Sequence, residues 1–148
     1  MNARLALLVV AAVATATRPA HAQNQYQQQI SNQMIRRAQT LNSRGYNAIG
    51  QLYTGSINDD ADANLTVTLN AGTQVAVLGV CDNDCTDVDL QVYSQDGVKI
   101  GEDIDTDDYP VVAFTTQYTG NYRVRVMMAT CNTNPCYYGV QVFANGGK

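Results

Sequence analysis

The feature that most constrains the fold is a two-residue rhythm of apolar side chains that begins after Gly45. Successive side chains of an extended strand point to opposite faces, so this alternation gathers the apolar ones on a single face. The rhythm is clearest at 65–69, 88–92, 122–128 and 138–143, and it is weaker at 51–57, 98–101 and 111–116. The run 75–80 is apolar on both parities, which is typical of a strand covered on both sides.

Turn-forming triplets separate these segments at regular intervals: Asn70-Ala71-Gly72, Gln95-Asp96-Gly97 and Thr119-Gly120-Asn121. Roughly eight short strands, each with one apolar face, predict an all-β chain folded as an antiparallel β-sandwich. A closed β-barrel is the alternative, because alternation alone does not show whether a sheet closes on itself.

The first 22 residues have the form of a signal peptide rather than of a folded segment. Arg4 supplies a positive start, 5–14 is continuously apolar, and Ala20-His21-Ala22 is a small-x-small cleavage site. The apolar stretch is too short for a membrane span, which needs about twenty residues, although an uncleaved anchor is the alternative. We therefore expect an exported protein, periplasmic or extracellular, with a helical lead-in over 23–45 and a sandwich domain over 46–148.

The lead-in repeats its apolar residues at helical spacing, and Gly45 is a plausible stop. The repeating positions are Tyr26, Ile30, Met34, Ala38 and Leu41. Such a helix either lies on its own domain or serves as an arm that binds a partner.

Four cysteines behind an export signal predict two disulfides rather than a thiolate metal site. Three pairings are possible. The local bridges Cys81–Cys85 and Cys131–Cys136 are favoured because each pair straddles a turn-rich segment, and a long-range link such as Cys81–Cys136 is the alternative.

Charge excludes one class of partner. The chain has 13 acidic residues against nine Lys and Arg, and every acidic residue lies between Asp59 and Asp108. Cleavage of the leader would remove Arg4 and Arg18 and make the domain more acidic still. An acidic domain repels phosphate backbones, so nucleic acid is not an expected partner. No segment after the leader is apolar enough to predict a membrane span.

The ordered strands resemble the bacterial pre-peptidase C-terminal domain, which is related to the collagen-binding domains of secreted collagenases. The similar segments, covering roughly 50–144, are Gly55-Ser56-Ile57 before an Asp-rich loop, the strand 65–69 with its Ala71-Gly72 turn, 87–93 followed by Asp96-Gly97, and 119–126. The resemblance implies an eight-stranded, jelly-roll-like sandwich. No peptidase domain accompanies it in this sequence.

The resemblance also implies a calcium site at Asp59 and Asp62, which match an Asp-x-x-Asp loop of the family. The linker before that loop contains no Asp or Glu, where several family members have acidic ligands. A second candidate calcium cluster comes from the residues alone, because calcium takes six to eight oxygen ligands and a turn can gather carboxylates. This cluster is Asp82, Asp84, Asp87 and Asp89, beside the Cys81–Cys85 segment. The alternative for both clusters is that these residues are solvated turn formers. The run 103–108 lacks the glycine and the glutamate of an EF-hand loop and predicts only a charged edge or loop.

Tyrosine is the abundant aromatic residue, and the chain has no tryptophan. Tyr122 and Tyr138 share parity with inward valines and are expected in the core. Tyr118 and Tyr137 are off those registers and are the candidate binding residues, since tyrosine anchors proteins or polysaccharides at surfaces.

Catalysis is not expected. The single histidine, His21, lies in the predicted leader, and bridged cysteines are not nucleophiles. The sequence predicts an exported, non-catalytic binding or accessory module that engages a protein or polysaccharide and is stabilised by calcium. The alternative is a structural or assembly protein of the periplasm or cell envelope that associates through its helix and binds no metal. The sequence does not set the oligomeric state.

Overall fold

The computed structural model describes residues 20–146. Helix α1 (Ala20–Ser43) is followed by eight strands. They are β1 (Tyr46–Ile57), β2 (Asp62–Leu69), β3 (Gln74–Cys81), β4 (Cys85–Tyr93), β5 (Lys99–Asp103), β6 (Val111–Thr115), β7 (Gly120–Cys131) and β8 (Cys136–Asn145). The predicted leader falls largely on residues 1–19, outside the described part, and its cleavage site Ala20–Ala22 falls in the first turn of α1.

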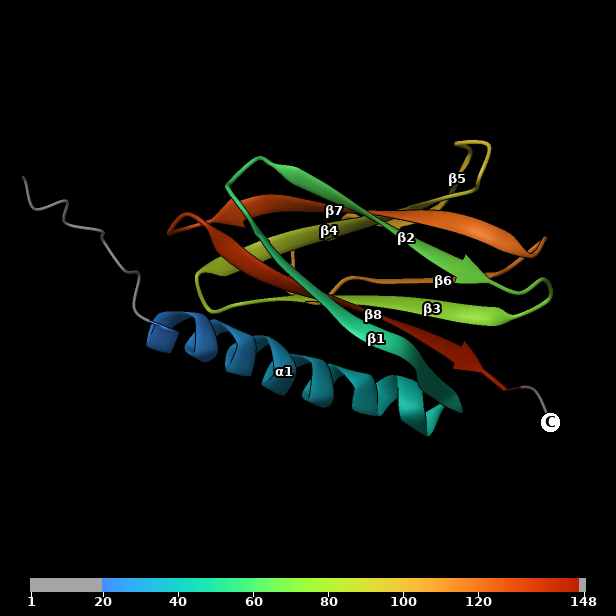
Figure 1. The fold of residues 1–148 in the computed structure, drawn as a ribbon, viewed down its shortest axis with the longest axis horizontal. Coiled ribbons are helices and arrows are strands. Elements are labelled where there is room, and N and C mark those ends of the chain that lie inside the picture. Colours follow the sequence, from blue (N-terminus) through green and yellow to red (C-terminus); the bar gives the residue numbers. More distant parts are fainter. Residues whose placement is uncertain (1–19, 147–148) are drawn as a thin grey trace, which may run out of the picture.

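The strands form two four-stranded sheets, which confirms the sandwich and not the barrel. Sheet A has the order β1-β8-β3-β6 and sheet B the order β2-β7-β4-β5. All pairings are antiparallel. This interleaved order is that of a jelly roll, in which consecutive strands mostly belong to opposite sheets. Figure 1 shows the strands running roughly along the long axis of the molecule, with sheet B above sheet A.

The main core lies between the sheets and is built by the residues that the alternation predicts to face inward. Val88, Leu90 and Val92 of β4 are almost completely buried, and so are Val124 and Val126 of β7. Tyr122 is also buried, as expected, and Tyr138 is partly buried against the same core. Their outward neighbours on β4 and β7 keep partial or full exposure.

Helix α1 covers the outer face of sheet A as a third layer. Its apolar residues Ile30, Met34, Ala38 and Leu41 pack on Ala76, Leu78, Val80 and Phe143 of the sheet. Gln33, itself buried, donates a hydrogen bond of 2.6 Å to the carbonyl of Cys81. The helix therefore lies on its own domain, along the lower side of the sheet in Figure 1. This third layer explains why the run 75–80 is apolar on both parities.

Strand β1 begins at Tyr46, well before the predicted 51. The pattern missed its first half because β1 is an edge strand whose residues 47–51 are exposed and show no alternation. A register shift between Ile49 and Tyr53 bends the strand at Gly50, whose φ is 69°. No helix within residues 20–146 is long and apolar enough to cross a bilayer.

Both disulfides are the predicted local ones, Cys81–Cys85 and Cys131–Cys136. Cys81 ends β3 in sheet A, whereas Cys85 begins β4 in sheet B. Cys131 ends β7 in sheet B, and Cys136 begins β8 in sheet A. Each bridge therefore links the two sheets, and Cys85 lies opposite Cys131 in the β4–β7 pairing, so both bridges lie at the same end of the sandwich.

Candidate functional site

The disulfide end of the sandwich gathers three loops that carry acidic residues or their partners. The backbone N–H of Asp59 donates to Asn134 Oδ1 at 2.7 Å, and that of Asn132 donates to the Asp84 carbonyl at 2.8 Å. The β7–β8 loop is thus hydrogen-bonded to both the β1–β2 loop and the β3–β4 loop. Of the predicted calcium ligands, Asp59, Asp62, Asp82 and Asp84 lie in or next to these loops, and Asp87 and Asp89 lie within β4.

Asp59 and Asp62, the pair suggested by the family resemblance, have different partners. Asp59 Oδ1 accepts the N–H of Cys131 at 2.7 Å. The two oxygens of Asp62 accept from Arg125 at 3.0 Å and from Asn64 at 3.4 Å. The hydrogen bond and charge of Arg125 lower the pKa of Asp62. The carboxylates of Asp59 and Asp62 therefore already accept hydrogen bonds from donors of the chain.

Asp82 supports the backbone of the disulfide loop. The residue is buried, and its two oxygens accept the N–H groups of Tyr137 at 2.9 Å and of Asp84 at 3.3 Å. Burial raises the pKa of the Asp82 carboxyl, and the hydrogen bonds from the N–H groups of Tyr137 and Asp84 oppose this rise. Its carboxylate thus joins the β3–β4 loop to the first residues of β8.

Asp87 and Asp89 point outward from β4, away from that loop. Asp87 Oδ1 is buried and has no hydrogen-bond partner among the described residues. Burial raises the pKa of Asp87, and the charge of Asp107 adds to the shift. Burial also raises the pKa of Asp89 to about 6, with further contributions from Asp87, Asp103 and Asp107. This part of the surface therefore concentrates negative charge around Asp87 and Asp89.

Within residues 20–146, no three His, Cys, Asp or Glu side chains come close enough together to hold a metal ion. The four residues of the second predicted cluster divide into a backbone-supporting pair, Asp82 and Asp84, and an outward pair, Asp87 and Asp89.

The two candidate tyrosines are each stacked on another tyrosine. Tyr118 lies parallel to Tyr122 with ring centroids 5.0 Å apart, and its hydroxyl accepts the N–H of Gln95 at 2.6 Å. Tyr137 lies parallel to Tyr26 of α1 at 4.4 Å and borders a hollow of about 160 Å³ between the helix and β1. One ring face of each tyrosine is therefore occupied, and their role in ligand binding stays a prediction.

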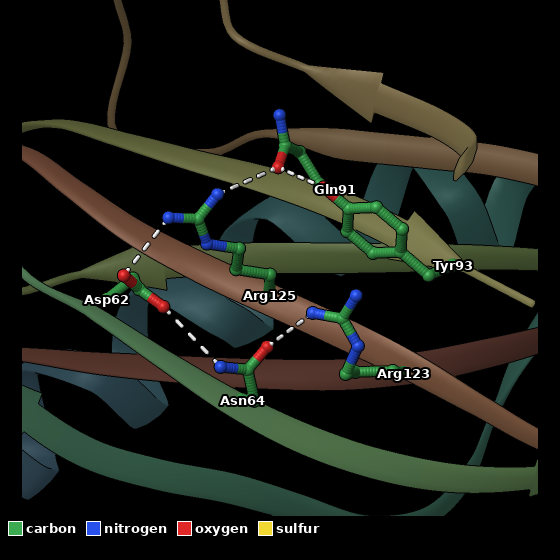
Figure 2. A network of polar contacts seen from close by, with 6 residues as sticks. All are labelled: Asp62, Asn64, Gln91, Tyr93, Arg123 and Arg125. Carbon is green, nitrogen blue, oxygen red and sulfur yellow. Dashed lines mark hydrogen bonds and ion pairs between the residues drawn. The ribbon is translucent and has the colours of Figure 1, made fainter. Parts of the chain in front are cut away.

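The outer face of sheet B carries an ordered set of polar side chains, which we call the polar network. Its members are Asp62, Asn64, Gln91, Tyr93, Arg123 and Arg125 (Figure 2). They come from the three adjacent strands β2, β7 and β4, where Asn64 pairs with Arg125 and Arg125 pairs with Gln91. Strand register thus brings together residues that are far apart in the sequence.

Arg125 is the centre of this network. It forms an ion pair with Asp62 and donates to Gln91 Oε1 at 3.4 Å, and Gln91 in turn accepts the Tyr93 hydroxyl at 2.6 Å. The network continues to β5, because Gln91 also donates to Glu102, which is paired with Lys99 at 2.7 Å. The hydrogen bond from Lys99 lowers the pKa of Glu102.

Arg123 has a different environment from Arg125. Its guanidinium lies 4.0 Å over the Tyr93 ring and donates to Asn64 Oδ1 at 2.8 Å, as Figure 2 shows. Among residues 20–146 it has no carboxylate partner within ion-pair distance. Arg123 borders a hollow of about 240 Å³ that is also lined by Thr66, Ser94, Gln95, Gly97, Asn121 and Tyr122.

No catalytic arrangement is present in the described residues that would pair a nucleophile with a base. All four cysteines are in disulfides. Lys99 is exposed and paired with Glu102. The His21 side chain lies outside the part that the structure describes.

Comparison with known proteins identifies the fold. No family model matches the chain, and no curated protein sequence matches it. Among solved structures, the pre-peptidase C-terminal domain of a Bacillus anthracis collagenase matches with a TM-score of 0.51 and 12% identity, over 64% of this chain and 89% of that one. The predicted fold resemblance is thus confirmed.

Two other solved structures match less well. The Aeromonas hydrophila protein PliG, a periplasmic inhibitor of g-type lysozyme, has a TM-score of 0.46 and 15% identity, over 67% of this chain and 89% of that one. The carbohydrate-binding module CBM36, solved with calcium and xylotriose, has a TM-score of 0.32 and 21% identity, over 66% and 91%. At these identities the likeness concerns the fold alone.

Proposed function

We propose that this chain is an exported, non-catalytic binding module that engages a protein or polysaccharide partner through the outer face of sheet B. The observation that carries the proposal is the asymmetry of the sandwich. Helix α1 buries the outer face of sheet A, whereas the outer face of sheet B is not covered by any described segment and carries the polar network. Two disulfides support export, because such bonds persist in oxidising compartments outside the cytosol.

The geometry of the network favours binding over mere solvation. Long charged side chains lose rotamer freedom when they are ordered, and that loss opposes binding. Here Arg123 and Arg125 are already oriented by Tyr93, Asn64 and Asp62. A partner that contacts this face meets donors that are held in place by rigid strands, which lowers the entropic cost of association.

Assembly through the helix has less support from the packing. The apolar side of α1, formed by Ile30, Met34, Ala38 and Leu41, is occupied by sheet A. A partner of the helix would have to use its exposed side, where Ile35 is a large apolar residue with 63% of its surface accessible.

Calcium is a second proposal, confined to Asp87 and Asp89. The buried oxygen of Asp87 without a partner and the concentrated negative charge around Asp89 favour a cation there. Asp59, Asp62 and Asp82 are the poorer candidates, because donors of the chain already occupy their carboxylates. Bound calcium would offset the repulsion between β4 and the β5–β6 loop.

A pair of bulky substitutions tests the binding face. Thr66 on β2 and Asn32 on α1 are both exposed, one on each side of the sandwich. Oxidised T66W and N32W are compared with the parent protein on immobilised polysaccharides and on purified envelope proteins. We expect T66W to abolish binding that N32W leaves unchanged. The proposal would be overturned if T66W left binding unchanged, as N32W is expected to do, or if only N32W abolished it.

A further inference from the structure

We infer that the hollow beside Arg123 is a carboxylate-binding subsite for a uronic acid unit of an acidic polysaccharide. The inference rests on the proposed function, since the hollow opens on the same outer face of sheet B. It goes further by assigning the chemistry of the ligand.

Arg123 is oriented by its neighbours but forms no ion pair with a carboxylate of the described residues. The ring of Tyr93 supports one side of its guanidinium, and Asn64 occupies one terminal nitrogen. A guanidinium carries several N–H donors in a planar fork that matches the two oxygens of a carboxylate. Neighbouring Arg125 has its carboxylate in Asp62, whereas Arg123 has none among residues 20–146. The difference between these two arginines on one strand is what points to a ligand.

The rest of the lining supplies further donors and no negative charge. Thr66 is exposed and has no described side-chain hydrogen bond. Asn121 uses its oxygen to accept from Thr68, which leaves its amide N–H groups unused in the described contacts. The hydroxyl of Ser94 accepts the N–H of Val98 and keeps its own proton for donation. Asp96 occupies the same turn but is exposed and is not part of the lining.

The lining favours a sugar acid over an acidic peptide. Peptides gain affinity from apolar pockets for their side chains or from a free strand edge. This hollow lies against the face of β7, an inner strand of sheet B, and its one large ring, Tyr122, is buried with its hydroxyl bonded to Tyr118. Hydroxyl and amide groups around one cation instead match the hydroxyls and the single carboxylate of a uronate.

The charge distribution of the domain is compatible with such a ligand. Most carboxylates lie near the disulfide end, in or beside the loops 58–61, 82–84 and 104–110. The hollow is at the opposite end, where the turn after β4 meets the β6–β7 loop through Gln95 and Tyr118. At ordinary ionic strength, charges more than about 8 Å apart are largely screened, which weakens the effect of carboxylates at the other end of the sandwich. The charge of Asp62 does interact with Arg123, but Asp62 is itself paired with Arg125.

The test uses the oxidised full-length mature protein and three matched polymers: polygalacturonate, its methyl ester and polyglutamate. Binding is measured by calorimetry, and amide shifts in ¹⁵N spectra locate it. R123Q removes the proposed carboxylate partner, and R36Q removes the same charge from an exposed position on α1. Circular dichroism and melting confirm that each variant folds.

We expect polygalacturonate to bind, with shifts at Asn121, Tyr122 and Arg123, and R123Q to weaken it about tenfold to a hundredfold. R36Q should bind like the parent, and the methyl ester should bind as weakly as R123Q does. If polygalacturonate and its ester bind equally well and T66W abolishes the binding of both, this inference is overturned and the proposed function is kept. Binding of polyglutamate alone would overturn the uronate assignment. Absence of any T66W-sensitive binding would overturn both.

Discussion

Ile30 of helix α1 lies directly on Gly139 of strand β8. A Cβ atom built on Gly139 would come within 2.5 Å of Ile30 Cγ2. A contact this close leaves no room for a side chain at position 139, so the glycine sets how near the helix approaches the sheet. Sheet A is buried on one face by sheet B and on the other by α1 because this approach is possible.

Replacing Gly139 by alanine should loosen the helix from the sheet. The new methyl group overlaps Ile30, and overpacking of this kind typically costs about 1 to 3 kcal/mol. We expect the melting temperature of G139A to fall by several degrees in a thermal scan. Gly146 provides the control, because a Cβ atom added there would meet nothing within 4 Å. Equal melting of G139A and G146A would contradict the packing described here.

Two isoleucines of α1 give a matched test of the third layer. Ile30 has 1% of its surface exposed and Ile35 has 63%. Truncation of a buried isoleucine to alanine costs about 2 to 5 kcal/mol, whereas an exposed one is nearly neutral. We expect I30A to unfold at clearly lower urea concentration than I35A. If the two variants unfold together, the helix is not packed on the sheet in solution.

The carboxyl of Asp89 should make stability fall as the pH rises. Its folded-state pKa of about 6 lies above the ordinary value of 3.8, so the folded chain holds the proton more tightly than the unfolded chain. The folded state is therefore favoured by protonation, and this benefit is lost between about pH 4 and pH 6. We expect D89N, in chelator, to be more stable than the parent near neutral pH by about 1 kcal/mol, after allowance for solvent screening.

The gain in D89N should disappear below about pH 4, where both states of the parent are protonated. Melting temperatures measured across this range check the prediction. D96N removes an exposed charge from the turn after β4 and serves as the control. A gain in D89N that persists unchanged at low pH would contradict an origin in the titration of this carboxyl.

Calcium should stabilise the parent protein and not the D87N/D89N double variant. Extracellular modules bind calcium with dissociation constants of about 0.1 to 1 mM. At tenfold excess over the dissociation constant, binding stabilises the fold by about 1.4 kcal/mol, a rise of several degrees in melting temperature. D59N is expected to respond to calcium like the parent. If D59N loses the calcium-induced rise in melting temperature, the site lies in the β1–β2 loop instead. If calcium does not raise the melting temperature of the parent, neither site binds calcium.

The fold could be predicted from the sequence because its determinants are local. The two-residue alternation depends only on neighbouring residues and located seven strands, and the continuous apolar run 75–80 located the eighth, β3. The same holds for the disulfides, since Cys81 and Cys131 each pair with a cysteine four or five residues away. The first half of β1 was missed because an exposed edge strand has no buried face to impose alternation.

The polar network could not be predicted because it depends on strand register. Arg123 and Arg125 occupy outward positions of the predicted strand 122–128, and Tyr93 directly follows the predicted strand 88–92, which was a usable signal. Nothing in the sequence indicates that Asn64 of β2 lies opposite Arg125, or that Tyr93 of β4 lies opposite Arg123. Tyr118 was selected for being off the core register, yet loop geometry turns its ring onto Tyr122.

The placement of the two disulfides makes the ends of the sandwich mechanically unequal. Both covalent bridges cross from one layer to the other at the same pole, so the layers there cannot be pulled apart without breaking a bond between sulfur atoms. At the far pole the layers are joined by the β2–β3 and β6–β7 loops, by side-chain packing and by hydrogen bonds, without a disulfide. Separation of the two layers is therefore opposed by fewer covalent links beside Arg123 than at the cysteines.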